Sequence, residues 1–459
     1  MGLVASNVST YTLLQETWSY CHPTKMSFMK PKRILHQALR KAFSYLPKSV
    51  RFSLYRRFVD FDLKPDQRLQ LKIADTKEEL EACFRLLHDA YVGSGFMKPD
   101  PSGMRATIYH ALPTTTTLCA KFDGEIVGTI SLIRESIFGF PLQAAFDLQE
   151  IRAKGGSIAE VSALAVHPKF RKTGGAIMFP LMKFMWEYSY LYFDTRHLVI
   201  AVNPDRIEMY ESLLMFERLE SAAVDKYDFA NGAPAVGAHL DLGNATALYK
   251  QAYGTKPSRK NIYMYFMRMR MPNILTPSRR YFTTNDPVMT PPLLDYFFNR
   301  STSGFKNLNE HDRMRLHSIY DTPEYADVLP PMFKDSEGGA RQRQHQRYSL
   351  KCPARFKSSD VASTGEFDLR VVELSETGFL AYSKVPLKAD VWGEVTVQLG
   401  AHETSRVSAK VTHGKFKDAY GFYGFKLGEP DLAWRKFVGV LKAGTTHEDM
   451  ENATRFLVQ

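Results

Sequence analysis

The chain has 459 residues, with 60 Lys and Arg against 49 Asp and Glu, which gives a net charge of +11 at pH 7. This length predicts two or three domains, and a content of 44% hydrophobic and 24% charged residues is typical of globular proteins. No run of about 18 apolar residues occurs, which argues against a spanning helix, and the N-terminus lacks the pattern of a secretory signal. Four scattered cysteines without metal-ligand spacing predict reduced thiols, no metal site and a cytoplasmic protein.

Residues 1–65 are predicted to form a basic leader. The stretch 25–57 holds ten Lys and Arg residues and no Asp or Glu. Its apolar residues Leu35, Leu39, Phe43 and Leu46 share one helical stripe. Such a helix can lie on an anionic membrane surface, as a peripheral contact with the inner membrane, or it can pack on the next domain. The second interpretation is favoured, because apolar stripes usually face a core.

Alternating strands and helices follow from Leu69 onward. The predicted strands are 69–73, 117–122, 126–133, 158–166 and 197–202, and the predicted helices are 77–93, 177–192 and 206–217. Asp123-Gly124 is a hairpin turn signal between two of the strands. We therefore predict an α/β domain with a mixed central sheet over residues 66–255.

The second half of the chain changes character twice. Residues 256–334, here named the extension, are Pro-rich and helical, with helices expected near 292–299 and 310–320. Residues 335–340 are rich in Gly and polar residues and are the predicted linker. Short strands with Gly turns, followed by a helix over 432–441, predict a small β-barrel in residues 341–445 and a tail over 446–459.

The strand 158–166 and the turn after it carry a candidate for catalysis. Glu160 lies on the strand, and a partly buried carboxylate with a raised pKa can act as a base. The turn Arg171-Lys172-Thr173-Gly174-Gly175-Ala176 precedes a helix, where glycines allow backbone N–H groups to bind phosphate. Backbone N–H groups near Val166 could polarise a carbonyl group.

These motifs resemble the GNAT acyltransferases. The segments Glu160–Val166, Ile151–Gly156 and Asn231–Ala235 further resemble the long-chain N-acyl amino acid synthases, relatives of the acyl-homoserine lactone synthases. The resemblance spans roughly residues 69 to 325. It implies transfer of a fatty acyl group from an acyl-phosphopantetheine thioester, on acyl carrier protein or coenzyme A, to the amine of an amino acid.

The resemblance also assigns residues to roles. Glu160 becomes the base, and Tyr210 the acid that protonates the leaving thiolate. Phosphopantetheine binding falls to Val166, Arg171, Lys172, Gly174, Gly175 and Ala176. The basic loop could steer an acidic acyl carrier protein. Two alternatives stay open, a non-catalytic interaction protein on a degenerate GNAT scaffold and an acetyl-CoA-dependent acetyltransferase.

A second motif pair lies in the predicted barrel. An Arg-x-x-x-Arg box at Arg343 and Arg347 is followed by Glu373-Leu374-Ser375-Glu376-Thr377-Gly378. Paired arginines can fork onto phosphate oxygens and guanine edges. The pair resembles the signature of PilZ domains, which implies cyclic di-GMP as an allosteric ligand bound by Arg343, Arg347, Glu373, Ser375 and Gly378. That family usually carries Asp or Asn in place of Glu373. No nucleic-acid partner is expected.

Overall fold

The fold is taken from a computed structural model. It describes residues 45–171, 173–219, 224–227, 233–276, 282–283, 289–320, 323–332, 345, 347–359, 365–399, 403–417 and 420–443. The predicted linker, the tail and most of the leader lie outside these residues. Among the described helices, none is long and apolar enough to cross a membrane.

The first half of the chain forms a mixed sheet in the order β1-β2-β3-β4-β5-β8-β6, and β7 pairs with β8. The strands are β1 (Leu69–Ile73), β2 (Thr115–Phe122), β3 (Glu125–Arg134), β4 (Ser157–Val166), β5 (Thr195–Val202), β6 (Glu217–Arg218), β7 (Val224–Tyr227) and β8 (Ala233–Asp241). β4 and β5 pair in parallel, and the other pairs along the sheet are antiparallel. The predicted GNAT-like α/β fold with a mixed central sheet is confirmed.

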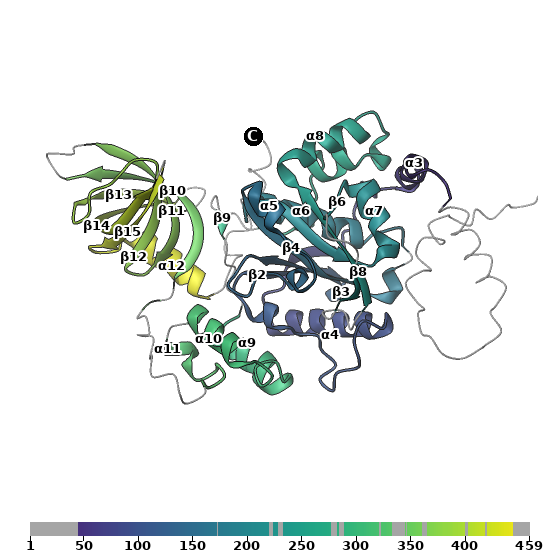
Figure 1. Ribbon diagram of the computed structural model, residues 1–459, viewed down its shortest axis with the longest axis horizontal. Helices are drawn as coiled ribbons and strands as arrows, with labels where there is room; N and C mark the ends of the chain where they lie inside the picture. The colour runs from purple at the N-terminus through teal and green to yellow at the C-terminus, as the bar shows by residue number, and fades with distance from the viewer. Residues whose placement is uncertain are drawn as a thin grey trace, which may run out of the picture.

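Helices cover both faces of this sheet (Figure 1). Helix α4 (Lys77–Gly93) lies on one side, and α6 (Met178–Leu191), α7 (Pro204–Leu214) and α8 (Leu242–Tyr253) lie on the other. α4 begins where the Thr76 side chain accepts a hydrogen bond from Glu79 N–H, which stabilises the first turn. The shorter helices in this part of the chain are α3 (Lys48–Phe58), η2 (Ile108–Ala111), η3 (Pro141–Ala144), α5 (Gln149–Ala153) and η4 (Pro168–Phe170).

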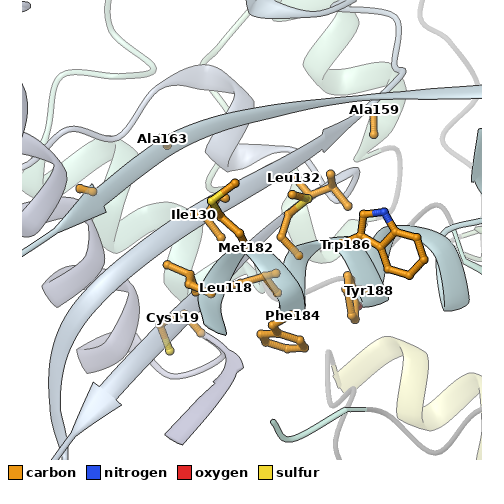
Figure 2. Packing of buried hydrophobic residues seen from close by; sticks show 14 of the residues in the cluster. Leu118, Cys119, Ile130, Leu132, Ala159, Ala163, Met182, Phe184, Trp186 and Tyr188 are labelled. Carbon is orange, nitrogen blue, oxygen red and sulfur yellow. The ribbon is translucent and has the colours of Figure 1, made fainter. Parts of the chain in front are cut away.

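The main hydrophobic core lies between α6 and the sheet. Figure 2 shows Met182 and Trp186 of α6 beside Ile130 and Leu132 of β3. Every α6 residue from Phe179 to Ser189 is buried, including the ion pair between Lys183 and Glu187. The methionine-rich sequence of this helix is therefore explained by packing.

The extension packs as a series of short helices. They are η6 (Ser258–Lys260), the π-helix η7 (Met264–Arg268), α9 (Pro291–Leu294), the π-helix η8 (Asp295–Ser301), α10 (Glu310–Ile319) and α11 (Pro323–Ala326). The helix predicted near 292–299 is thus an α-turn that widens into a π-helix, and the one near 310–320 is confirmed as α10.

The C-terminal part is a closed barrel of six strands. They are β10 (Tyr348–Ser358), β11 (Glu366–Ser375), β12 (Gly378–Ser383), β13 (Trp392–Gln398), β14 (Thr404–Lys417) and β15 (Tyr420–Leu427). Pairing of β10 with β11 closes the ring, and helix α12 (Leu432–Ala443) buries Trp434 completely. The predicted small β-barrel with a closing helix is confirmed.

Candidate active site

Glu160 lies in the middle of the sheet and is almost completely buried, with 2% of its surface exposed. Its Oε2 atom accepts a hydrogen bond of 2.9 Å from the Leu142 N–H group. No ion pair joins Glu160 to a cation among the described residues. Burial without a counter-charge raises the pKa of this carboxyl to about 8, although the Leu142 hydrogen bond acts in the opposite direction.

The charge of Glu160 affects the pKa of two tyrosine side chains. Burial, and then the Glu160 carboxylate, raise the pKa of Tyr109 to about 12. The same two causes raise the pKa of Tyr227 above its ordinary value. Both phenols therefore stay protonated at neutral pH. We refer to Glu160, Tyr109, Tyr227 and the Leu142 N–H group as the Glu160 site.

The Glu160 site could not be assembled from local sequence patterns. Tyr109 belongs to η2, Leu142 to η3 and Tyr227 to the short strand β7, so three distant segments contribute. None of the three carries a motif, which explains why the sequence pointed only to Glu160.

β4 separates from β5 just beyond Glu160. The parallel pairing of β4 with β5 ends at Glu160 and Val199, although β4 continues to Val166. Ala163 has a positive φ of 55°, and the register with β3 shifts between Thr129 and Ser131, which marks a β-bulge. Beyond Glu160, the described part of β4 therefore pairs with β3 and no longer with β5.

The predicted phosphate loop forms a tight turn between η4 and α6. Gly174 and Gly175 have φ values of 66° and 86°, a region that L residues avoid. A Cβ atom at Gly175 would lie 2.5 Å from the Phe179 ring. Arg171 Nε donates a hydrogen bond of 2.8 Å to Val166 O, which ties the loop to the end of β4, and Ala176 leads into the helix. Lys172 lies outside the described residues.

Tyr210 lies on α7, which follows β5. Its ring is half-buried and meets Phe216 edge-on, with ring centroids 6.0 Å apart. Burial raises the pKa of its phenol, so the group holds a proton that it could donate. Among the residues that the structure describes, no hydrogen bond joins Tyr210 to the Glu160 site.

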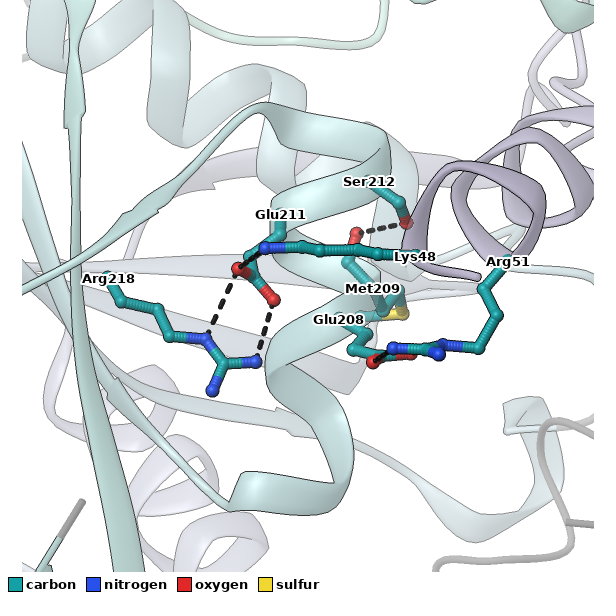
Figure 3. A network of polar contacts seen from close by, with 7 residues as sticks. All are labelled: Lys48, Arg51, Glu208, Met209, Glu211, Ser212 and Arg218. Carbon is teal, nitrogen blue, oxygen red and sulfur yellow. Dashed lines mark hydrogen bonds and ion pairs between the residues drawn. The ribbon is translucent and has the colours of Figure 1, made fainter. Parts of the chain in front are cut away.

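The basic helix α3 packs on α7 beside Tyr210. Figure 3 shows Lys48 reaching Glu211 at 3.0 Å and the Arg51 guanidinium against Glu208. Arg218 also pairs with Glu211, at 2.9 Å. Residues 48–58 therefore pack on α7, in line with the interpretation that the sequence favoured over membrane contact. Of the predicted stripe, only Leu46 is described, and it is exposed.

In the barrel, the predicted ligand residues meet at the start of β10 and the β11–β12 turn. Arg347 Nη1 lies 2.8 Å from Glu373 Oε1 in an ion pair. Ser375 pairs with Gly378 across the turn, and its hydroxyl donates to Gly378 O at 3.2 Å. We refer to Arg347, Glu373, Ser375 and Gly378 as the arginine site. Arg343 lies outside the described residues.

No cluster of His, Cys, Asp or Glu side chains that could hold a metal ion occurs in the described parts of the chain.

Comparison with known proteins shows what the first domain resembles. Residues 82–241 match the family model of the N-acyl amino acid synthase FeeM. No curated protein matches the chain.

Three solved structures illustrate the likeness. The N-acyl amino acid synthase FeeM from uncultured soil microbes shares 23% identity over 39% of this chain and 94% of its own, with a TM-score of 0.33. The acyl-homoserine lactone synthase LasI shares 15% identity over 38% of this chain and 90% of its own, with a TM-score of 0.29. A putative acetyltransferase from Salmonella typhimurium, solved with acetyl-CoA, shares 16% identity over 38% and 95%, with a TM-score of 0.28.

The family match covers β4, the phosphate loop, α6 and α7, so the segment that carries Glu160 lies inside it. Residues 82–241 are similar to an N-acyl amino acid synthase, and the domain that contains them has a GNAT-like acyltransferase fold.

Proposed function

We propose that this protein transfers a long-chain acyl group from a phosphopantetheine thioester to the amine of an amino acid. The observation that carries the proposal is the buried Glu160 carboxyl, with its raised pKa, on the strand that precedes the phosphate loop. The donor is an acyl carrier protein or acyl-CoA, and the carrier protein is the preferred partner because of the sequence resemblance. We assign this activity to residues 66–255.

The reaction needs one base and one acid. The amine nitrogen attacks the thioester carbonyl carbon, a C–N bond forms, and the C–S bond breaks. Glu160 accepts the proton that the amine loses, which its pKa of about 8 allows at mildly alkaline pH. Tyr210 supplies a proton to the departing thiolate, and N–H groups beyond the β4 bulge stabilise the oxyanion. Arg171, Gly174, Gly175 and Ala176 hold the pantetheine phosphate together with Lys172.

The test is an assay for N-acylated product with purified protein. Mass spectrometry should detect N-acyl amino acids when the protein is incubated with acyl carrier protein loaded with a long-chain acyl group. A mixture of amino acids serves as acceptor. If only acetyl-CoA supports acylation, the chain is an acetyltransferase. If no thioester is consumed, the proposed reaction is wrong.

We further propose that the barrel, residues 341–445, is a PilZ domain that binds cyclic di-GMP and regulates the enzyme. The proximity of Arg347, Ser375 and Gly378 supports this ligand, because a guanidinium can bind phosphate and a serine beside glycine admits a purine. Arg343 completes the proposed set. Titration calorimetry should detect cyclic di-GMP binding to the wild-type chain and its loss in Arg347→Ala. Without heat at micromolar ligand, the barrel serves only as an interaction module.

Peripheral membrane contact remains a proposal for the leader, residues 25–57. Lys48, Arg51 and Arg56 are engaged with α7, so the basic residues before them would supply the membrane contact of an otherwise cytoplasmic protein. Deleting residues 1–44 should release the protein from anionic vesicles while α3 stays in place. Unchanged partitioning would leave packing as the role of the leader.

A further inference from the structure

The helix η2, which carries Tyr109 to the Glu160 site, is held by the extension. The buried Tyr320, at the end of α10, donates its hydroxyl to Ala111 O, the last residue of η2. Within η2, His110 Nδ1 accepts a hydrogen bond of 3.1 Å from Thr107 N–H. The position of η2, and with it that of Tyr109, therefore depends on a contact with a residue 209 positions after Ala111.

A second set of contacts links η2 to the extension. Phe297 of η8 meets Phe84 of α4, with ring centroids 5.1 Å apart, and Phe84 meets His110 at 5.0 Å. Tyr296 of η8 also donates a hydrogen bond of 2.6 Å to Glu81 on α4. Two parts of the extension thus fix the same short helix.

The extension also reaches the barrel. Strand β9 (Phe282–Thr283) pairs with β10 at Leu350 and Lys351. Tyr325 of α11 stacks on Tyr320, with ring centroids 4.5 Å apart and an interplanar angle of 27°. Tyr325 and Glu324 lie near enough to Tyr348 to raise the pKa of its phenol, after the larger effect of burial.

Tyr348 is the first residue of β10 and directly follows Arg347 of the arginine site. A ligand phosphate that draws Arg347 away from Glu373 acts on the residue directly before Tyr348. Tyr348 interacts electrostatically with Tyr325, and the ring stack and the Tyr320 hydroxyl then lead from Tyr325 to Ala111.

We propose that the stacked pair Tyr325–Tyr320 couples the arginine site of the barrel to the Glu160 site, with Tyr320 as a positioning residue for Tyr109. The inference rests on the proposed function, because it names the path by which the barrel regulates the enzyme. Coupling of this kind requires one element that both sites displace, and η2 together with α10 and α11 is that element. The ring stack is buried and stiff, so a displacement at its barrel end is passed on to Ala111.

Hydrogen–deuterium exchange of the full chain tests the positioning role without any need for activity. Tyr320→Phe keeps the ring stack and loses only the hydroxyl that holds Ala111 O. Exchange in residues 105–115 should become about fivefold faster, the effect of one lost buried hydrogen bond. Tyr325→Phe is the matched control, because it keeps the same stack and loses a longer bond of 3.4 Å to Met289 O. Equal exchange in both variants would overturn the role of Tyr320.

The pH dependence of acyl transfer separates positioning from general stability. Loosening η2 admits water to Glu160, so the alkaline rise of kcat/KM should move to lower pH in Tyr320→Phe and stay in place in Tyr325→Phe. An unshifted profile in Tyr320→Phe contradicts the positioning role, even if the variant melts at a lower temperature.

A double-mutant comparison tests the coupling itself. Arg347→Ala breaks the ion pair with Glu373 and should change exchange in residues 105–115, far from the substitution. Tyr325→Ala removes the stack, so adding Arg347→Ala to it should cause no further change in that segment. The coupling is refuted if Arg347→Ala leaves residues 105–115 unaffected, or if its effect persists without the Tyr325 ring. Absence of acyl transfer, by contrast, would remove the proposed function and leave this exchange result intact.

Discussion

Glu160 and Glu373 are two glutamates that the sequence singled out, and the structure places them in opposite environments. Glu160 is buried at the centre of a sheet, and a backbone N–H group, that of Leu142, donates a hydrogen bond to it. Glu373 lies at the edge of the barrel, with 29% of its side chain exposed, and it pairs with Arg347. The first carboxyl is held neutral until mildly alkaline pH, whereas the charge of the second is offset by a guanidinium.

The difference shows what each environment is suited to do. A carboxyl with a pKa near the working pH can exchange a proton during a reaction. A surface carboxylate paired with an arginine competes with any anion that approaches that arginine. It therefore lowers the affinity of the arginine for an anionic ligand. Burial therefore determines the properties of the candidate site in the α/β domain, and exchangeable charge contacts determine those of the site in the barrel.

The largest expected effect comes from Glu160→Gln, which keeps the shape of the side chain and removes the base. Loss of a general base should lower kcat by about 10²–10⁴-fold, measured as N-acylated product by mass spectrometry. Glu217→Gln is the matched control, since Glu217 lies on β6 of the same sheet with 74% of its side chain exposed. Wild-type turnover in Glu160→Gln would remove this residue from its role.

Cyclic di-GMP binding should be lost in Arg347→Ala and unchanged in Glu160→Gln, which lacks the base but keeps the barrel. Loss of cyclic di-GMP binding in Glu160→Gln, measured by titration calorimetry, would contradict the assignment of the two functions to separate domains.

A smaller effect is expected from Gly175→Ala in the phosphate loop. The new Cβ atom would lie 2.5 Å from the Phe179 ring at a φ of 86°, so the turn must open. The KM for the acyl thioester should rise, and the free energy of unfolding should fall by about 1–3 kcal/mol. Gly155→Ala is the matched control, because its φ is 70° and nothing lies within 4 Å of the added atom. Identical KM values for the acyl thioester in the two variants would show that the loop does not bind the donor.

The raised pKa of Glu160 also predicts how stability depends on pH. The ordinary pKa of the carboxyl is 4.5 and the folded-state pKa is about 8, so the folded state binds the proton more tightly between these values. The contribution of Glu160 to the free energy of unfolding therefore falls as pH rises through this window, by at most about 1.4 kcal/mol per pH unit.

Glu160→Gln removes this dependence. The free energy of unfolding of this variant is measured by urea denaturation from pH 5 to pH 9. Relative to that of the wild type, it should increase as pH rises. Parallel curves for the two proteins would mean that Glu160 is not buried as a neutral group.

The smallest effect is expected at the arginine site. Glu373→Ala removes the carboxylate that competes for Arg347, and surface ion pairs contribute about 0.2–1 kcal/mol. Cyclic di-GMP should therefore bind up to about fivefold more tightly, as measured by titration calorimetry. Glu366→Ala, an exposed change on the same strand β11, is the control. Weaker binding in Glu373→Ala would show instead that this carboxylate contacts the ligand.

Much of the fold could be predicted from the sequence. The hydrophobic periodicity gave β1 and α4 at their observed bounds, and Asp123-Gly124 marked the β2–β3 hairpin. The glycines of the phosphate loop and the position of Glu160 on β4 were also predicted. These features depend on neighbours within a few residues, which a sequence displays directly.

Other features were decided by the tertiary structure alone. The sequence did not indicate that α7 would be the helix on which α3 packs, that β9 would join the barrel, or that the charge of Glu160 would act on Tyr109 and Tyr227. Each is a contact between segments far apart in the chain. The sequence thus determined which side chains could carry a proton or bind a phosphate. Only the folded chain decided which of them lost water and which kept a counter-charge, because desolvation and pairing depend on long-range approach.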